Sequence, residues 1–327
     1  MGKILITGGA GFIGSHFREM FPEADFIVSD INSTKLDASN PMHFIADIRD
    51  ENAMRKIFES FPIDAIIHLA AAHKDFGIEQ DEYFSTNVDG AKVLCKLATA
   101  FNVRKIVFYS SVAIYGERDT PTDDHTPPQP TNDYGKSKLM AEDVLNNWYN
   151  QNENRTLIIV RPALVYGERN VANMYRLIDH IKKGLYFNIG EGNNIKSIAY
   201  VKNLVAATWY LLNSLDAGKY WFNYSDKPHL TTGEIGNYVA ELLGKPKPKS
   251  ISLNMLLLLA KPFDFLGMVS GKDLPISSHR VRKYASQTYH QADKIFKLGF
   301  TPEYSSRDGL KCMVEWYKDN KEEKQRV

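Results

Sequence analysis

Three glycines near the amino terminus constrain the fold more than any other feature of the chain. Gly8, Gly11 and Gly14 follow the apolar run Lys3–Thr7 and lie where it passes into an amphipathic stretch that begins near Ile13. Glycine permits a tight turn and a close approach of the backbone where a strand passes into a helix. A strand, such a turn and a helix predict the first unit of a parallel sheet with helical crossovers.

The first half of the chain continues this alternation of short apolar runs and amphipathic stretches. Strands are expected at residues 3–7, 25–29, 43–45, 65–69, 105–109 and 157–160, and helices at 13–20, 51–60, 82–101 and 133–151. The predicted fold class is therefore α/β, a doubly wound parallel sheet of the Rossmann type with a smaller, mostly helical C-terminal domain.

The glycine turn also offers a binding site for a pyrophosphate. The amino terminus of the next helix carries free N–H groups and a partial positive charge. Asp30, at the end of the second predicted strand, can accept hydrogen bonds from ribose hydroxyls, and its charge repels a 2′-phosphate. The sequence therefore predicts NAD rather than NADP, and the alternative is that the glycines serve only a packed turn. Asp47, after the third strand, could contact the adenine amine or cap the next helix.

These features suggest how the chain is divided. We expect residues 1–168 to form the NAD-binding domain and residues 169–327 to form mostly a substrate-binding region. Helices are expected there at 173–183, 203–212 and 232–243. Short strands at 186–189, 198–201 and 220–222 could return to the first sheet, so the chain would cross the domain boundary more than once.

Composition excludes several classes of protein. Forty Lys plus Arg oppose 39 Asp plus Glu, a net charge of +1, so no overall field favours nucleic acid or an anionic membrane. Cys95 and Cys312 are too few for a disulfide framework and are not spaced as zinc ligands, so no metal is expected. Apolar runs fall far short of the roughly 20 residues of a membrane span. A cytoplasmic location without stable membrane insertion is expected.

A tyrosine and a lysine four positions apart are candidates for catalysis. Tyr134 and Lys138 share one face of a predicted helix. A nearby ammonium group favours the phenolate form of tyrosine, which makes Tyr134 a candidate base near neutral pH. Ser111 follows an apolar strand at the end where doubly wound sheets bind ligands, and its hydroxyl could hold a substrate oxygen. By spacing alone, a Tyr and a Lys four positions apart are more typical of a solvated helix face than of a catalytic pair.

Together these residues resemble the extended short-chain dehydrogenase/reductase family, which includes NAD-dependent nucleotide-sugar epimerases and dehydratases. The resemblance covers nearly the whole chain. It extends to the segments HLAA, NVDG, RPALVYG and YVKNLV, which begin at His68, Asn87, Arg161 and Tyr200.

The resemblance implies roles for individual residues. Ser111, Tyr134 and Lys138 would form the catalytic group, and Asn87 would orient the central helix. The expected contacts to NAD are Gly8, Gly11, Phe12, Ile13, Gly14, Asp30, Asp47, Ile48, Leu69, Ala70, Ala71, Asn87, Ser110, Tyr134, Lys138 and Pro162. The expected contacts to a nucleotide-sugar substrate are Ser111, Ala113, Tyr134, Asn173, Lys196 and Arg282. The last three could hold a diphosphate or be ordinary surface residues.

The residues after Ser111 bear on the reaction. Val112 and Ala113 stand where family members that dehydrate or decarboxylate sugars carry acidic residues. Removing water requires an additional acid and base, which apolar side chains do not supply. The prediction is an NAD-dependent nucleotide-sugar 4-epimerase acting through a keto intermediate, with a UDP-sugar as substrate. The alternatives are a 4-ketoreductase, a hydroxysteroid-dehydrogenase-like NAD(H) oxidoreductase and a silent dinucleotide-binding regulator.

Three further features concern the substrate and the assembly. Lys196 and Ser197 stand where sugar epimerases commonly have Arg and Asp, and Leu164 replaces a common Asn, which disfavours a standard UDP-galactose 4-epimerase. The segment 254–269 is unusually apolar, and a buried packing helix is preferred to a cover over a lipid-like substrate. The helices at 82–101 and 133–151 could bury a self-complementary homodimer face.

Overall fold

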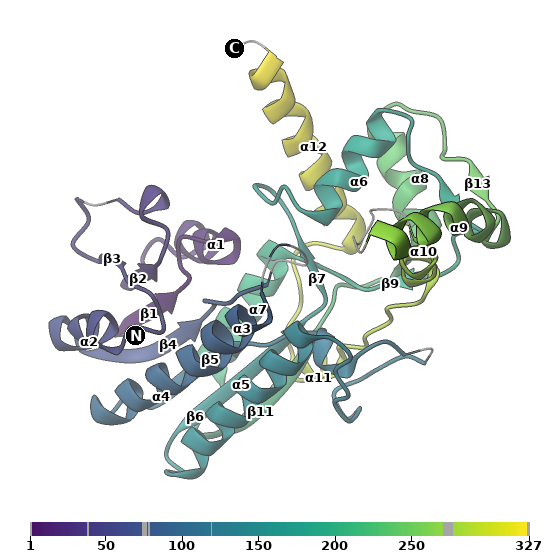
Figure 1. Ribbon diagram of the computed structural model, residues 1–327. Coiled ribbons are helices and arrows are strands. Elements are labelled where there is room, and N and C mark those ends of the chain that lie inside the picture. The colour runs from purple at the N-terminus through teal and green to yellow at the C-terminus, as the bar shows by residue number, and fades with distance from the viewer. Residues whose placement is uncertain are drawn as a thin grey trace.

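Seven parallel strands form the central sheet of the protein (Figure 1). The structure is a computed structural model that describes residues 2–37, 39–73, 77, 79–118, 120–270 and 277–325. The strand order is β11-β6-β5-β4-β1-β2-β3. The bounds are β1 (Lys3–Thr7), β2 (Phe26–Asp30), β3 (His43–Ile45), β4 (Ile63–His68), β5 (Lys105–Tyr109), β6 (Thr156–Pro162) and β11 (Gly218–Tyr224).

Helices cover both faces of this sheet. One face carries α2 (Glu51–Ser60), α4 (Gly90–Ala100) and α5 (Asp133–Asn150), and the other carries α1 (Phe12–Met20) and α7 (Val201–Ser214). Because side chains of a strand alternate between faces, Ile4 and Ile6 belong to the core under α1 and α7, whereas Leu5 belongs to the core under α2 and α4. The predicted α/β class with a doubly wound parallel sheet is confirmed.

The helix expected at 82–101 is interrupted. It consists of α3 (Gln80–Phe84), a π-helical turn η2 (Ser85–Asp89) and α4. The turn carries the buried side chain of Asn87, whose amide bonds to groups outside the helix. Such π-helical turns occur frequently at functional sites, and helical periodicity in the sequence does not reveal them.

The second half of the chain is mostly helical. It contains α6 (Asn173–Lys182), α8 (Thr232–Leu242), α9 (Leu253–Ser270), α10 (Ser278–Ala285), α11 (Asp293–Lys297) and α12 (Ser306–Gln325). Three short two-stranded sheets accompany them: β10 (Ile198–Tyr200) with β7 (Leu164–Tyr166), β12 (Leu230–Thr231) with β9 (Ile195–Lys196), and β13 (Ser250–Ile251) with β8 (Asn188–Ile189). Two short 3₁₀ turns, η1 (Ser33–Lys35) and η3 (Val112–Tyr115), follow strands of the main sheet.

The late strands only partly follow the sequence prediction. The expected return of residues 220–222 to the first sheet is confirmed, because β11 pairs in parallel with β6 at the sheet edge. The expected return of residues 198–201 is wrong: β10 pairs with β7, and Val201 already begins α7. Since β5 and β11 occupy both sides of β6, that part of the sheet offers no edge to β10. Residues 188–189 likewise pair with β13 instead.

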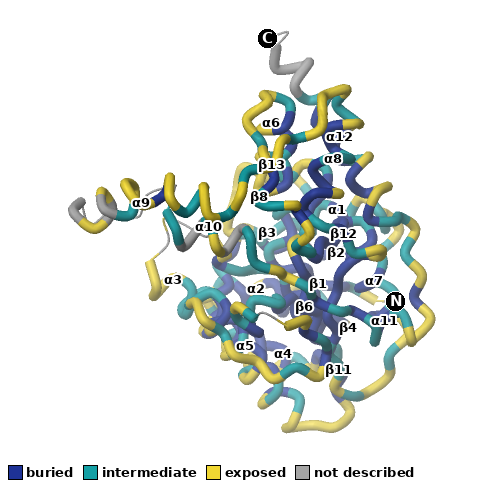
Figure 2. The backbone as a smooth tube through the Cα atoms, turned by 90° about the vertical axis from the view of Figure 1, so that its right-hand side faces the viewer, coloured by how far each residue is buried: buried dark blue, intermediate teal, exposed yellow. Residues whose placement is uncertain are grey.

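The apolar segment 254–269 is not the buried packing helix that was preferred from the sequence. It forms most of α9, which projects from the body of the molecule and is largely exposed (Figure 2). Its contacts are mainly with α10. Within the described residues, no helix combines the length and the apolar character required to cross a membrane.

Candidate active site

The turn between β1 and α1 leaves almost no room for side chains. Gly8 has a φ of +69°, and a Cβ atom on it would lie 2.7 Å from the backbone nitrogen of Ala70. A Cβ atom on Gly14 would lie 2.5 Å from the carbonyl oxygen of Gly9. Glycine is therefore required here by close packing as well as by backbone conformation.

The amino terminus of α1 suits a bound phosphate. Gly11 is the N-cap, and in the described structure no side chain caps the helix through a hydrogen bond. The first turn of α1 contains no acidic residue. Its backbone N–H groups and partial positive charge are therefore available to an anion. This arrangement fits the pyrophosphate of a dinucleotide.

Asp30 closes the same turn from the end of β2. Its Oδ2 accepts a hydrogen bond from the backbone N–H of Ala10 at 3.0 Å, and its Oδ1 accepts one from Asn32 at 2.9 Å. These two bonds hold the carboxylate at the edge of the sheet, beside the start of α1. The position suits the ribose contact predicted from the sequence.

Asp47 does not cap the next helix, so that alternative is wrong. Asp50 is the N-cap of α2, and its carboxylate accepts from the backbone N–H groups of Asn52 and Ala53. Asp47 instead forms an ion pair with Arg49, which lowers the pKa of its carboxyl group. Its contact with an adenine amine stays a prediction.

A buried polar pair lies below the glycine turn. Thr7 Oγ1 and His68 Nδ1 are 2.7 Å apart, at the ends of β1 and β4. Burial lowers the pKa of His68 to about 3, with a further contribution from the charge of Lys138, so the imidazole is neutral. His68 belongs to a motif noted in the sequence, but its partner on another strand was not foreseen.

The chain segments that carry the candidate catalytic residues pack together, because α5 lies on η3. A Cβ atom on Gly135 would lie 2.5 Å from the carbonyl oxygen of Ala113, so the start of α5 lies directly against η3. Tyr134 stands next to this contact, and Ser111 is the N-cap of η3, with Oγ accepting from Ala113 at 3.1 Å. Asn132 caps α5 by accepting from the N–H of Gly135 at 2.8 Å.

Lys138 is buried beside the end of β5. Its Nζ donates to the carbonyl oxygen of Tyr109 at 2.7 Å and lies 4.8 Å from the centre of the Phe108 ring. Burial lowers the pKa of Lys138 to about 7, and the negative charge of Glu142, one helical turn further along α5, opposes this shift. The ammonium group of Lys138 is thus held at the carbonyl of Tyr109, two residues before Ser111. Tyr134 lies one helical turn before Lys138 on α5.

Asn87 connects three segments around this site. Its Oδ1 accepts from the N–H of Ala72 at 2.9 Å, and its Nδ2 donates to Ala72 O at 3.1 Å and to Ser137 Oγ at 2.9 Å. Ser137 lies on α5 between Tyr134 and Lys138. These bonds support the orienting role that the resemblance assigned to Asn87.

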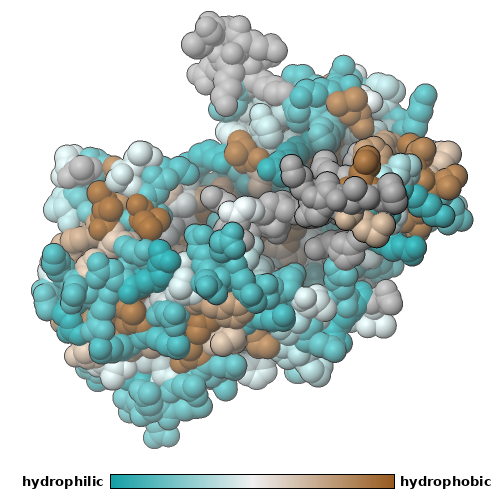
Figure 3. Space-filling view, in the orientation of Figure 1, coloured by the Kyte–Doolittle hydropathy of each residue, from teal (hydrophilic) through white to brown (hydrophobic). Residues whose placement is uncertain are grey.

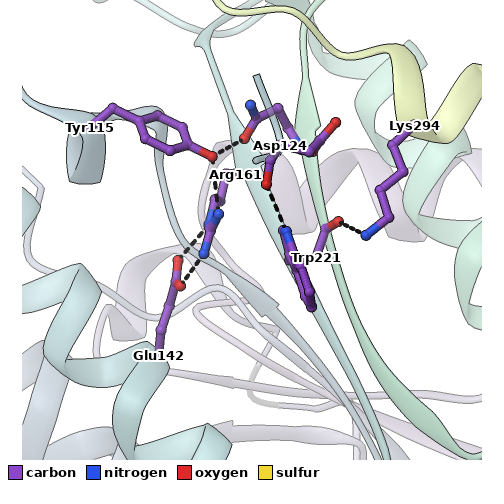
Figure 4. Close-up of polar contacts among 7 residues, drawn as sticks. Tyr115, Asp124, Glu142, Arg161, Trp221 and Lys294 are labelled. Carbon is purple, nitrogen blue, oxygen red and sulfur yellow. Dashed lines mark hydrogen bonds and ion pairs between the residues drawn. The ribbon is translucent and has the colours of Figure 1, made fainter. Parts of the chain in front are cut away.

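A buried network of hydrogen bonds joins α5 and η3 to the strands β6 and β11 (Figure 4). Arg161 on β6 donates to Glu142 at 2.9 Å and 2.6 Å and to the hydroxyl of Tyr115 at 3.0 Å. Tyr115 donates to Asn223 Oδ1 at 2.8 Å, and the backbone N–H of Asn223 donates to Asp124 at 2.5 Å. Glu142 was not identified from the sequence, although its position four residues after Lys138 was a usable signal.

The remaining residues predicted to contact NAD lie at or just after the carboxyl ends of the parallel strands. They are Phe12 and Ile13 in the first turn of α1, Ile48 after β3, Leu69, Ala70 and Ala71 after β4, Ser110 after β5, and Pro162 at the end of β6. The carboxyl ends of parallel strands are where such sheets bind ligands.

The residues predicted to contact the substrate lie on more widely separated elements than those predicted to contact NAD. Lys196, on β9, donates from Nζ to the carbonyl oxygen of Ser286 at 2.6 Å, and Arg282 is exposed on the adjacent α10. Asn173 is exposed at the start of α6, a separate helix. Their roles toward a substrate stay predictions. Across the described ranges, no cluster of three His, Cys, Asp or Glu side chains could hold a metal ion.

Comparison with known proteins identifies similar chains. The model of the NAD dependent epimerase/dehydratase family matches residues 4–223. The N-acetyl-α-D-glucosaminyl-diphospho-ditrans,octacis-undecaprenol 4-epimerase of Escherichia coli O157:H7 is 35% identical over 316 residues, which cover 96% of this chain and 95% of the relative. The dTDP-D-glucose 4,6-dehydratase of Homo sapiens is 26% identical, covering 97% and 90%.

A solved structure has the same fold. The NAD complex of UDP-glucose 4-epimerase from Thermus thermophilus superposes with a TM-score of 0.75 over 97% of this chain and 99% of the other, at 24% sequence identity.

Proposed function

This chain belongs to the NAD dependent epimerase/dehydratase family, and from that premise we propose that it is a 4-epimerase of a sugar carried on a diphosphate. Membership makes the protein an NAD-dependent enzyme of the extended short-chain dehydrogenase/reductase type, and the resemblance drawn from the sequence is thereby confirmed. The observation that supports the proposal is the packing of the start of α5, which carries Tyr134 and Lys138, against η3, whose N-cap is Ser111.

The proposed roles of the protein groups follow from their positions. Tyr134 accepts the proton of the sugar 4-hydroxyl and returns it after the configuration has changed. Ser111 holds the same oxygen by a hydrogen bond. Lys138, held near Tyr109, contributes positive charge that favours the phenolate of Tyr134. When bound, NAD would supply reversible hydride transfer at the sugar carbon.

The surroundings of Ser111 favour epimerisation over dehydration. Val112 and Ala113 follow it, and neither side chain can transfer a proton. An elimination needs an acid for the leaving hydroxyl and a base for the neighbouring carbon. Reversible hydride transfer needs only the proton transfer that Tyr134 provides.

Two kinds of diphosphate carrier are consistent with this reaction. The sequence favours a nucleotide, with UDP as the first choice. The relative from Escherichia coli, which matches nearly the whole chain, is named for a sugar on an undecaprenyl diphosphate. Both are substrates to be tested, because the reacting groups of the site act on the sugar and not on its carrier.

The test is to incubate the purified protein with UDP-linked and polyprenyl-diphosphate-linked N-acetylglucosamine and glucose in deuterated water. We expect the 4-epimer to form with no deuterium at C4 and no net change in NADH absorbance, because the hydride returns to the same carbon. NAD should also be released from the freshly purified protein on denaturation, in near-stoichiometric amount.

The control is the Tyr134→Phe variant, which retains the ring but lacks the hydroxyl. Its turnover should fall by about 10²–10⁴-fold, the usual contribution of general acid–base catalysis, while its NAD content stays unchanged. Net NADH consumption would indicate the 4-ketoreductase or hydroxysteroid-dehydrogenase-like alternative. Unchanged turnover of Tyr134→Phe would disprove the assignment of the base.

A further inference from the structure

Helix α9 presents apolar side chains to solvent along one face. Met255, Leu258, Leu259, Phe263 and Leu266 are exposed by 48%, 64%, 59%, 39% and 54% of their surface. Their spacing of i, i+3, i+4, i+8 and i+11 places them on the same side of the helix. Figure 3 shows hydrophobic residues gathered at the right-hand end of the molecule, over α9. A contiguous apolar patch on a protein surface marks an interaction site.

Part of the opposite side of α9 is used for packing, although Met268 near its end is 75% exposed. Ala260 is fully buried there. Asp264 accepts hydrogen bonds from the backbone N–H and the hydroxyl of Ser278, at 2.9 Å and 2.5 Å, and so fixes the start of α10. Asp264 is the one acidic residue in the α9 sequence, and it faces α10. The exposed face of α9 is therefore apolar and free of negative charge.

Positive charge adjoins this face. Lys245, Lys247 and Lys249 are exposed in the segment between α8 and β13, and β13 is followed by α9. The α10 sequence, SHRVRKYA, contains three Arg or Lys residues and no acidic residue, and Arg282 is exposed. Basic residues therefore occur in the segments on both sides of α9 in the sequence, in a chain whose net charge is only +1.

An anionic lipid bilayer has the chemistry that complements both features. Its acyl chains accept the apolar face of a helix lying in the interface, and its phosphates attract the neighbouring lysines and arginines. A second copy of the same surface would bring like charges together. We propose that α9, α10 and residues 245–249, together the docking surface, hold the protein on an anionic membrane.

The docking surface is joined to the candidate substrate region. Ser286, directly after α10, accepts hydrogen bonds from Lys196 Nζ at 2.6 Å and from Asn194 Nδ2 at 3.2 Å. Both donors lie in or next to β9, and Lys196 is a predicted substrate contact. Resting on the proposed function, this connection favours a substrate whose diphosphate is carried by a membrane lipid.

The test measures binding to vesicles without any substrate. The purified protein is sedimented with vesicles of phosphatidylcholine alone and with vesicles containing phosphatidylglycerol, at low and high salt. We expect cosedimentation with the anionic vesicles, weakened by salt, and little with phosphatidylcholine. Leu258→Glu should reduce the bound fraction by about tenfold or more, because it places a charge in the apolar face.

Leu298→Glu is the matched control, since Leu298 is also an exposed leucine (45%) but lies after α11, outside the docking surface. It should bind vesicles as the wild type does, and both variants should retain NAD as evidence of folding. A Lys245→Glu/Lys247→Glu/Lys249→Glu variant should lose the preference for phosphatidylglycerol.

The proposal is overturned if the wild type does not bind anionic vesicles, or if Leu258→Glu binds as well as Leu298→Glu. It is also overturned if Leu258→Glu halves the mass of the protein in solution while vesicles do not bind, since the face would then join two copies. Vesicle binding without epimerisation of any substrate would leave the docking surface in place and reject the proposed function instead.

Discussion

Gly8 shows how a single residue determines whether the site can form. Its φ of +69° disfavours any other residue by about 1–2 kcal/mol. In addition, a Cβ atom there would lie 2.7 Å from the nitrogen of Ala70, in the turn that is expected to receive the pyrophosphate. A side chain at Gly8 would therefore have two effects: backbone strain from the positive φ, and a steric clash in the predicted pyrophosphate site. A glycine with a similar φ but open surroundings separates the first effect from the second.

We predict that Gly8→Ala loses both stability and bound NAD. Gly184→Ala provides the matched comparison, because Gly184 has a φ of +70° and a Cβ atom added to it would meet nothing within 4 Å. Both variants should unfold at lower denaturant concentration, but only Gly8→Ala should be purified without NAD. Equal NAD contents in the two variants would contradict the proposed role of the turn.

His68 makes the stability of the protein sensitive to acid. Its pKa is lowered by burial from 6.5 to about 3 in the folded protein, so between these values the unfolded chain binds the extra proton. Stability contributed by the neutral imidazole is complete above pH 6.5 and is lost as the pH falls toward 3.

The variant His68→Asn keeps a polar group near Thr7 and removes this titration. Its free energy of unfolding should depend less steeply on pH between 3 and 6.5, by up to about 1.4 kcal/mol per pH unit for one proton. Chemical denaturation at a series of pH values measures both curves. Parallel curves for the two proteins would show that His68 does not titrate in this way.

At the scale of elements, the ion pair between α5 and β6 is the main buried polar connection below the site. Glu142 and Arg161 are 3% and 9% exposed at their side chains. Removing one member of a buried pair leaves the other charge without compensation, which costs about 3–5 kcal/mol.

Glu142→Gln should therefore destabilise the protein by several kcal/mol in chemical denaturation. Asp89→Asn is the control, because the exposed pair of Asp89 with Lys92 contributes at most about 1 kcal/mol. Similar losses in the two variants would mean that the buried pair has no special importance.

Comparing the predicted with the observed elements shows what the sequence can and cannot predict. β1, β3, β5 and α2 have the predicted bounds, because each carries a local signal: a short apolar run or an amphipathic stretch. The contacts of Thr7 with His68 and of Asn87 with Ser137 join residues far apart in the chain, so no local pattern indicates them. β10 was misplaced because strand pairing depends on which sheet edge is already occupied.

The apolar helix α9 was misjudged for a related reason. Hydrophobic composition predicts burial, but it does not say what provides the cover. Helix α9 contacts mainly α10, and its outer face has no protein layer over it in the described structure. The alternative drawn from the sequence was a cover over a lipid-like substrate, and it stays a prediction. The proposed docking surface instead places the apolar face of α9 against a membrane.

At the scale of the whole molecule, the homodimer expected from the sequence remains a prediction. The helices α4 and α5 pack against each other on one face of the sheet, and Met140 on α5 is 47% exposed (Figure 1). A two-fold interface brings the same face of both copies together, so one changed residue acts twice.

Met140→Arg should therefore convert a dimer into a monomer of 37.1 kDa in light scattering. Met255→Arg is the comparison, because Met255 is similarly exposed (48%) but lies on α9. This second variant should remain dimeric and bind anionic vesicles less well. A wild type with the monomer mass at every concentration would exclude the dimer.

The exposure of α9 also changes how the enzyme would search for its substrate. A protein held on a bilayer diffuses in a plane, so it meets lipid-borne molecules according to their mole fraction among the lipids and not their bulk concentration. Adding inert lipid would then slow turnover even when the total amounts of enzyme and substrate are constant. Membrane area would become a kinetic variable for this protein, alongside the chemistry at Tyr134.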